Sequence, residues 1–204
     1  MLFTKDRLIK KAQNELFDDL TWINESRQFS AAKTQVLEKA EKSRRLSGTK
    51  IYDIFLSHST DDSREVLGLV LELEDLGYSV YVDWIEDPEL DRSNVTKKNV
   101  QIIKNRMSDS KSLFFAFSTN AQESVWMPWE LGYFDGIKQK AAILPISETS
   151  QSSYNGTEYL KLYYYITKET TKNINKYYLW VNETNSKYVL YDDWINKNQE
   201  PYER

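Results

Sequence analysis

The feature that most constrains the fold of this chain is a regular alternation of strand and helix patterns between residues 50 and 147. Residues 51–56 and 113–117 form short apolar runs, and the second is apolar throughout, as in a strand covered on both faces. Further strands are expected at 78–82 and 141–146. Strands separated by helices favour a parallel, doubly wound α/β sheet, which binds ligands at the carboxyl ends of its strands.

Amphipathic helix patterns fill the intervals between these strands. One follows the first strand, with Asp61 or Asp62 as its capping residue and Gly77 at its end, because short acidic side chains favour helix starts and glycine favours helix ends. Another begins near Asn94. The apolar residues are Val66, Leu69, Val70 and Leu73 in the first, and Val100, Ile103 and Met107 in the second. Their spacing predicts helices that each bury one face.

Residues 1–48 have helix patterns only and are predicted to form a helical extension. A first helix would be followed by a second that starts at Ser30 and stops near Gly48, because serine and glycine mark helix boundaries. The inward residues would be Leu8, Ile9, Ala12 and Leu16, then Val36, Leu37 and Ala40. Two interpretations stay open: the extension covers one side of the main domain, or it is an assembly or regulatory module.

The C-terminal tail has weaker patterns. Residues 160–166 are expected to supply the last strand of the sheet. Residues 179–181 and 188–190 flank a polar turn, as the two strands of a β-hairpin do. Trp194 and Ile195 would attach a short terminal helix.

One histidine and no cysteine limit the chemistry of this chain. The lack of cysteine excludes disulfides, thiolate zinc sites and cysteine nucleophiles, and it fits a cytoplasmic protein. A single histidine, His58, excludes a multi-histidine metal centre within one chain. The net charge of −4 gives no general attraction for nucleic acid. No apolar run approaches the ~20 residues of a membrane helix, and the charged N-terminus is unlike a secretory signal. We therefore expect neither nucleic-acid nor membrane partners.

The stretch from Ser124 to Leu131 combines aromatic residues, a proline and a carboxylate at the start of a helix. Pro128 is tolerated only early in a helix, and Ser124 is a suitable N-cap, so Glu130 lies in or just after the first turn. The apolar face of this helix is expected to contain Trp126, Trp129, Tyr133, Phe134 and Ile137. Glu130 is therefore either a helix-capping residue or a catalytic carboxylate.

Polar and aromatic side chains follow several strand ends, which meet at one edge of a parallel sheet. They are Ser57, His58 and Ser59 after the first strand, Asp83 and Trp84 after the second, Ser118 and Thr119 after the third, and Trp126 and Glu130 from the next helix. Together they would line one crevice with hydroxyls, indoles and carboxylates.

Other chemistries fit these residues less well. Ser57, His58 and Asp83 could form a hydrolase triad on paper, but adjacent Ser and His side chains rarely point together, and the glycines of a nucleophile elbow are absent. His58 is more often a polar loop residue. The glycines are too scattered for a phosphate-binding loop. An acidic run could bind a metal ion, although such runs are more often solvated loops; its members are Asp83, Glu86, Asp87 and Asp91.

Three motifs in this order resemble the Toll/interleukin-1 receptor (TIR) domain family. Residues 52–59, Tyr-Asp-Ile-Phe-Leu-Ser-His-Ser, resemble the opening strand of the family. Residues 82–84, Val-Asp-Trp, lead into an acidic loop and resemble the end of the second strand. The pattern Ser124-x-Trp126-x-x-x-Glu130 is the most specific, because it resembles the members that cleave NAD+. Pro128 inside this pattern departs from the family.

The resemblance implies a flavodoxin-like sheet of five parallel strands with helices on both faces. It also implies no metal, no cofactor other than NAD+ as the substrate, and Glu130 as the catalytic residue. The substrate-binding residues would be Ser57, His58, Ser59, Asp83, Trp84 and Trp126. The TIR domain would span 49–198, with its motifs within 50–147 and a tail over 148–204, and residues 1–48 lie outside the resemblance.

The resemblance further implies a stand-alone microbial TIR protein similar to the Thoeris sensors of anti-phage defence. Such a protein would be an NAD+ glycohydrolase or ADP-ribosyl cyclase, and its nucleotide product would act on a separate effector. Self-association through TIR domains is expected, with rearrangement of the loop at 83–93. An NAD-depleting enzyme is the nearest alternative, and a non-enzymatic adaptor that acts by domain–domain contact is the alternative from another class.

Overall fold

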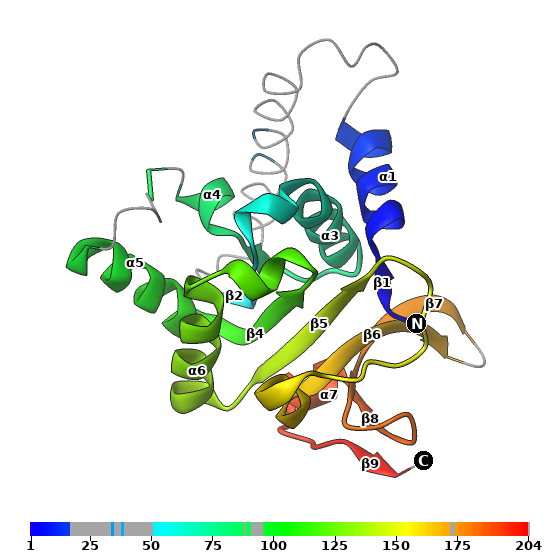
Figure 1. Cartoon of the computed structure of the whole chain (residues 1–204). Helices are drawn as coiled ribbons and strands as arrows, with labels where there is room; N and C mark the ends of the chain where they lie inside the picture. The colour runs from blue at the N-terminus through cyan, green and yellow to red at the C-terminus, as the bar shows by residue number, and fades with distance from the viewer. Residues whose placement is uncertain are drawn as a thin grey trace. The chain divides into compact units, whose positions relative to one another are not determined.

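The computed structural model describes residues 1–16, 34, 38, 51–87, 89–90, 96–171 and 174–203 (Figure 1). Its contacts divide the chain into two compact units. Unit 1 comprises Met1–Asp6, Ser57–Asp62 and Ser112–Arg204, and unit 2 comprises Arg7–Leu56 and Ser63–Lys111. The second helix predicted within residues 1–48, with Val36, Leu37 and Ala40, lies outside the described residues.

Unit 2 contains the first strand–helix–strand passage of the chain. Strand β2 (Tyr52–Ser57, whose last residue belongs to unit 1) pairs in parallel with β3 (Val80–Tyr81), so that Ile54 lies opposite Val80. Between them runs α3 (Ser63–Asp75), and all four of its predicted apolar residues are buried. The chain leaves the helix through Gly77, whose φ of 96° is unfavourable for other residues. The predicted order of strand, helix and strand is therefore confirmed here.

Helix α1 (Lys5–Leu16) approaches α3 closely within unit 2. Leu8 and Ala12 are buried, as predicted, whereas Ile9 is only partly covered. A Cβ atom added to Gly68 would lie 1.9 Å from the carbonyl oxygen of Leu8. Gly68 is therefore required by packing, since only a residue without a side chain lets the two backbones come so close. An ion pair of 2.6 Å between Lys11 and Asp75 adds to this contact.

The segment after β3 is partly helical, which corrects the prediction of a continuous loop. Helix α4 (Asp83–Glu86) buries Ile85 at 4% exposure, and this apolar contact favours an ordered turn. Residues 88 and 91–95 of the predicted loop lie outside the described residues. Helix α5 (Lys97–Ser108) begins three residues later than expected, because the side chain of Thr96 accepts a hydrogen bond from the amide of Asn99. Ile103 and Met107 are buried as predicted, and Val100 is partly covered.

Asp87 joins α4 to α5 in unit 2. Arg106 donates two hydrogen bonds of 2.8 Å to its carboxylate, and the hydroxyl of Tyr81 donates a third of 2.9 Å. Burial opposes the ionisation of Asp87, but the hydrogen bonds from Arg106 and Tyr81 outweigh it, so the pKa of this carboxyl lies below its usual value. Burial of the Tyr81 hydroxyl, together with the negative charge of Asp87, raises the pKa of Tyr81.

Unit 1 contains the remaining strands. Strands β4 (Ser110–Phe117), β5 (Ala141–Ser147) and β6 (Tyr164–Thr171) pair in parallel in that order, and β7 (Ile174–Asn182), β8 (Lys187–Leu190) and β9 (Tyr202–Glu203) continue by antiparallel pairing. Strand β1 (Phe3–Thr4) pairs in parallel with the end of β5. The 3-10 helix η3 (Glu158–Leu162) precedes β6, so the predicted strand at 160–166 begins four residues late.

Alternate residues of β4 face opposite sides of unit 1. The ring of Phe114 contacts Tyr191 of α7 (Tyr191–Asn196) at 5.2 Å, whereas Phe117 contacts Tyr154 at 5.6 Å. Trp194 in α7 is 1% exposed, so the predicted terminal helix is confirmed. The predicted hairpin of β7 and β8 is also confirmed, with Val181 opposite Val189.

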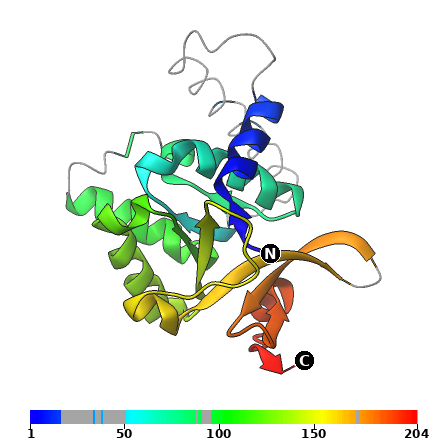
Figure 2. The ribbon, with the colours of Figure 1, turned by 45° about the vertical axis from the view of Figure 1, so that its right-hand side comes forward.

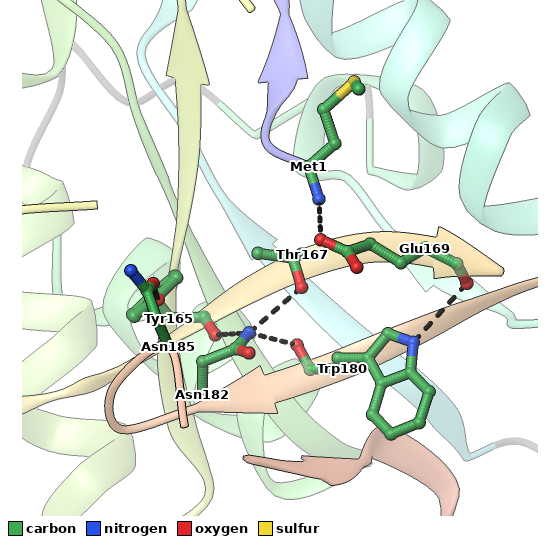
Figure 3. A network of polar contacts seen from close by, with 7 residues as sticks. All are labelled: Met1, Tyr165, Thr167, Glu169, Trp180, Asn182 and Asn185. Atoms are coloured by element: carbon green, nitrogen blue, oxygen red, sulfur yellow. Dashed lines mark hydrogen bonds and ion pairs between the residues drawn. The ribbon is translucent and has the colours of Figure 1, made fainter. Parts of the chain in front are cut away.

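Strands β6 and β7 form a long twisted hairpin that was not predicted from the sequence (Figure 2). The side-chain amide of Asn182 donates to the carbonyl oxygens of Tyr165 and Trp180 and to the hydroxyl of Thr167 at 3.0 to 3.1 Å (Figure 3). The amino group of Met1 forms an ion pair with Glu169 on the same hairpin. The bonds of Asn182 lie within the hairpin, and the contacts of Met1 with Glu169 and with the amide of Lys168 attach the hairpin to the first residue of the chain.

The parallel pairing of β2 with β3, of β4 with β5, and of β5 with β6 confirms the α/β class. The fold is a mostly parallel sheet flanked by helices. The antiparallel strands β7 to β9, and the short strand β1 that pairs in parallel with β5, are additions to the five parallel strands that were predicted. The described residues contain no helix that is long and apolar enough to cross a membrane.

Candidate functional site

The candidate site is organised around a buried hydrogen bond in unit 1. The hydroxyl of Ser57, at the end of β2, donates to a carboxylate oxygen of Glu130 at 2.6 Å, and both residues are 0% exposed. Glu130 lies on α6 (Trp126–Lys138), 73 residues further along the chain. A buried carboxylate must be hydrogen-bonded to be tolerated, so this contact fixes the side chain of Glu130 at the carboxyl end of a parallel strand, where α/β proteins bind ligands.

The start of α6 follows from its sequence. The hydroxyl of Ser124 accepts a hydrogen bond of 3.3 Å from the amide of Met127, which is the contact of a capping residue. Pro128 is the third residue of the helix, where a backbone N–H would have no partner within the helix, so the proline leaves the helix unbroken. Glu130 lies just past the first turn. The side chain that accepts a hydrogen bond at this helix end is that of Ser124, and the catalytic interpretation of Glu130 stays a prediction.

The buried face of α6 differs in part from the predicted apolar face. Its buried residues are Met127, Glu130, Leu131 and Phe134. Trp126, Trp129 and Tyr133 are only partly covered, and Ile137 is 46% exposed. The spacing of three and four predicted the helix and the burial of Phe134 correctly, but it placed the other buried positions on an adjacent stripe.

The partly covered aromatic residues contact one another along α6. The rings of Trp126 and Trp129 lie 5.7 Å apart at 79°, and those of Trp129 and Tyr133 lie 5.6 Å apart at 22°. Trp126 precedes Glu130 by four residues, so the two side chains lie on neighbouring parts of one helix face. A partly covered indole therefore lies one helical turn before the buried carboxylate.

The residues that follow β2 are also buried. His58 is 3% exposed and Ser59 is 7% exposed, so the run from Ser57 to Ser59 lies inside the protein. The hydroxyl of Ser59 accepts a hydrogen bond of 3.4 Å from the amide of Asp61, and its carbonyl accepts one of 3.2 Å from the amide of Asp62. This segment is folded back on itself in η1 (Thr60–Asp62).

Asp61 or Asp62 was predicted to cap the following helix, and in the structure Asp62 makes long-range contacts in unit 1. Its carboxylate accepts hydrogen bonds from the hydroxyl of Ser118 and, at 2.7 Å, from the side-chain amide of Asn120. Ser118 is the first residue after β4, and Asn120 begins η2 (Asn120–Glu123). The hydroxyl of Ser118 accepts from the amides of Asn120 and Ala121 at 3.1 and 3.2 Å. The loops after β2 and β4 are thereby joined.

Asp83 and Trp84 belong to unit 2, where they begin α4. Asp83 is 3% exposed, whereas Trp84 is partly covered. Their part in binding a substrate stays a prediction.

Two alternative chemistries have little support from the structure. The hydroxyl of Ser57 donates to Glu130, which differs from the serine–histidine hydrogen bond of a hydrolase triad. No group of three or more His, Cys, Asp or Glu residues in the described part of the chain is placed to hold a metal ion. Within the acidic run, Asp87 is engaged by Arg106 and Tyr81.

Comparison with known proteins identifies the relatives of this chain. The sequence profile of the TIR domain matches residues 54–176, from β2 into β7. A Bacillus cereus (strain MSX-D12) protein named "Probable 3' cyclic ADP-D-ribose synthase ThsB'" is 53% identical over 175 residues, which cover 84% of this chain and 86% of that protein. A Cytobacillus dafuensis protein named "Putative cyclic ADP-D-ribose synthase TIR2" is 27% identical over 139 residues, which cover 68% of this chain and 36% of that protein.

Proposed function

Because this chain belongs to the TIR domain family, we propose that it is an enzyme that cleaves NAD+ and closes the ADP-ribosyl group into a cyclic ADP-ribose. The observation that carries the proposal is the fully buried carboxylate of Glu130, held at 2.6 Å by Ser57 at the end of a parallel strand. The names of two relatives, both cyclic ADP-ribose synthases, support the same reaction.

The reaction breaks the bond between C1′ of the ribose and the ring nitrogen of nicotinamide. The bonding electron pair goes to that nitrogen, so nicotinamide leaves as a neutral molecule and needs no general acid. Positive charge develops on the ribose, as in glycoside hydrolysis. A hydroxyl oxygen or a ring nitrogen of adenine in the same molecule then bonds to C1′, which closes the ring. The proton is lost from that hydroxyl or, after attack by adenine, from the adenine amino group. Attack by water would instead yield ADP-ribose.

Glu130 supplies the negative charge for this reaction. A carboxylate fixed before the substrate arrives stabilises the developing cation, or holds a ribose hydroxyl, without rearrangement during the reaction. The hydrogen bond from Ser57 keeps the carboxylate in one orientation, and small displacements of such a group lower the rate strongly.

The remaining predicted site residues would bind the nucleotide. Trp126 lies one turn before Glu130 and is partly accessible, so its ring would stack on nicotinamide or ribose and exclude water. Trp84 would be a second stacking residue, and Asp83 a polar contact. His58 and Ser59 would complete the wall through ring, hydroxyl and backbone groups.

The biological role that we propose is a nucleotide signal in Thoeris-type anti-phage defence, read by a separate effector. The site would be completed by self-association of TIR domains, with rearrangement of the loop at 83–93. A cytoplasmic location, expected from the sequence, belongs to the same proposal. Control of this assembly by residues 1–48 is part of the same proposal.

Incubation of the full chain with NAD+, followed by mass spectrometry of the products, tests the function. A cyclic ADP-ribose together with free nicotinamide is the expected result. Linear ADP-ribose alone would indicate an NAD-depleting enzyme. Absence of nicotinamide release, even in assembled protein, would overturn the proposal and favour a non-enzymatic adaptor. The Glu130→Gln variant is the control for contaminating activity.

A further inference from the structure

The contact of Asp62 with Ser118 and Asn120 is a second link between the two segments that carry Ser57 and Glu130, and it closes a ring of the chain. Residues 57–62 form one side of this ring, and residues 118–130 form the other. The two sides meet at the Ser57–Glu130 hydrogen bond and again at Asp62. The segment that carries Ser57 is thus attached at both ends to the segment that carries Glu130.

Asp62 is an unusual residue for such a position. Its side chain is 2% exposed, and no lysine or arginine of the described residues forms an ion pair with it. A buried carboxylate without a cation is strongly unfavourable unless hydrogen bonds compensate for the lost water. Both carboxylate oxygens of Asp62 are used in this way, one by Ser118 and one by Asn120.

The hydrogen bonds of Asp62 also organise the connection that leads into α6. Ser118 donates to Asp62 with its hydroxyl hydrogen, so the hydroxyl oxygen is directed to accept from the amides of Asn120 and Ala121. These bonds hold the turn of η2, and α6 begins at Trp126 soon after it. The position of the helix start therefore depends on Asp62.

We propose that Asp62 is a positioning residue for the reaction, and this inference rests on the proposed cleavage of NAD+. Asp62 holds η2 and the start of α6 against residues 57–62, so that Glu130 and Ser57 keep the orientation needed when positive charge develops on the ribose. Asp62 itself stays away from the substrate. Its loss should lower kcat for NAD+ and change KM little, because misplacement of a charged group affects the transition state more than binding.

Exchanging the side chains of Asp62 and Asn120 tests the contact between them. Asn120→Asp places two carboxylates within hydrogen-bond distance and should break it, lowering kcat for nicotinamide release by about a hundredfold. Asp62→Asn keeps one acceptor for Ser118 and should lower kcat by about tenfold. The double variant restores one carboxylate and one amide, and should recover kcat to within about fivefold of the wild type. Asp61→Asn changes the neighbouring, exposed aspartate and should have no effect.

Rates are to be expressed per folded molecule. If Asn120→Asp fails to fold, Asn120→Ala removes the contact without introducing charge repulsion. Wild-type kcat in the folded single variants would overturn the inference. A double variant that regains stability but not kcat would also overturn it.

Hydrogen exchange separates this inference from the proposed function. The backbone amides of Met127, Trp129, Glu130 and Leu131 in α6 should exchange faster in Asn120→Asp and regain protection in the double variant. If the wild type releases no nicotinamide, the proposed function fails. The contact of Asp62 with Ser118 and Asn120 is then judged by hydrogen exchange alone. Unchanged hydrogen exchange in the single variants overturns the inference.

Discussion

The hydroxyl of Ser57 and the carboxylate of Glu130 form a hydrogen bond of 2.6 Å in the buried part of unit 1. The serine comes from the end of β2 and the glutamate from α6, so the fold brings together residues from distant parts of the chain. Hydrogen bonds to a charged carboxylate are stronger than those between neutral groups. This relationship leads to the first two predictions.

Glu130→Gln should abolish most of the nicotinamide release. The amide keeps the size and the hydrogen bonding of the glutamate but removes the charge, and loss of one preorganised electrostatic group lowers kcat by about a hundredfold or more. Steady-state kinetics with NAD+ measures the effect, and circular dichroism checks the fold. Glu123→Gln alters an exposed glutamate in η2 and should leave kcat unchanged. Full activity of a folded Glu130→Gln protein would show that another group stabilises the cation.

Ser57→Ala should lower both stability and activity. It removes one hydrogen bond from a buried carboxylate, so the free energy of unfolding should fall by about 1–3 kcal/mol. Urea unfolding measures this change. In a double-mutant cycle with Glu130→Gln, the losses in kcat should be less than additive, because the two side chains act as one unit. Additive losses would mean that Ser57 does not act through Glu130.

Trp126→Ala should raise KM for NAD+ more than it lowers kcat. The variant loses a stacking surface for the nucleotide, and base–aromatic stacking contributes about 1–3 kcal/mol in other nucleotide-binding proteins. Trp126→Phe should retain part of the affinity. Trp180→Ala removes another partly covered indole from β7 and is the matched control. Equal KM values for Trp126→Ala and Trp180→Ala would contradict a stacking function for Trp126.

Gly68→Ala should destabilise the contact between α1 and α3. The added Cβ would lie 1.9 Å from the carbonyl oxygen of Leu8, and such overpacking typically reduces the free energy of unfolding by about 1–3 kcal/mol. Gly132→Ala in α6 is the matched control, since its Cβ would meet nothing within 4 Å. Its higher helix propensity should raise stability by up to about 1 kcal/mol. Equal unfolding midpoints for the two variants would refute the packing explanation.

Arg106→Met should reduce stability in a pH-dependent way. The pKa of Asp87 in the folded protein lies below its usual value, which is about 3.9 for aspartate. Its stabilisation is therefore complete above pH 4 and is lost as the pH falls through the lower, folded pKa. The stability difference between wild type and Arg106→Met should be largest near pH 7 and shrink in acid below pH 4. Thermal unfolding across this range, with the exposed Lys98→Met as control, measures it.

Much of the fold could be predicted because its signals are local. The apolar run at 113–117 and the helix spacing after it need only neighbouring residues to be recognised, and both elements form where expected. The β6–β7 hairpin was missed because residues 167–171, Thr-Lys-Glu-Thr-Thr, are polar and become a strand only through pairing with β7. Strand β1 has two residues, too few for any pattern.

The candidate site was predictable in the identity of its residues but not in their contacts. Ser57 and Glu130 were found from motifs, and the structure adds the hydrogen bond between them. Asp62 was considered only as an alternative to Asp61 for a local capping function, whereas its side-chain partners lie 56 and 58 residues away. Capping rules describe neighbours along the chain, so a contact of this range has no sequence signal of its own.

The aromatic residues along α6 also give the protein an intrinsic optical probe. Trp126 and Trp129 lie edge to face, and Trp129 stacks on Tyr133, so excitation absorbed anywhere in this series can pass between the rings by energy transfer. A nucleotide stacked on Trp126 would quench the whole series at once. Nucleotide binding could then be followed by tryptophan fluorescence without a label, in the Glu130→Gln protein where turnover does not interfere.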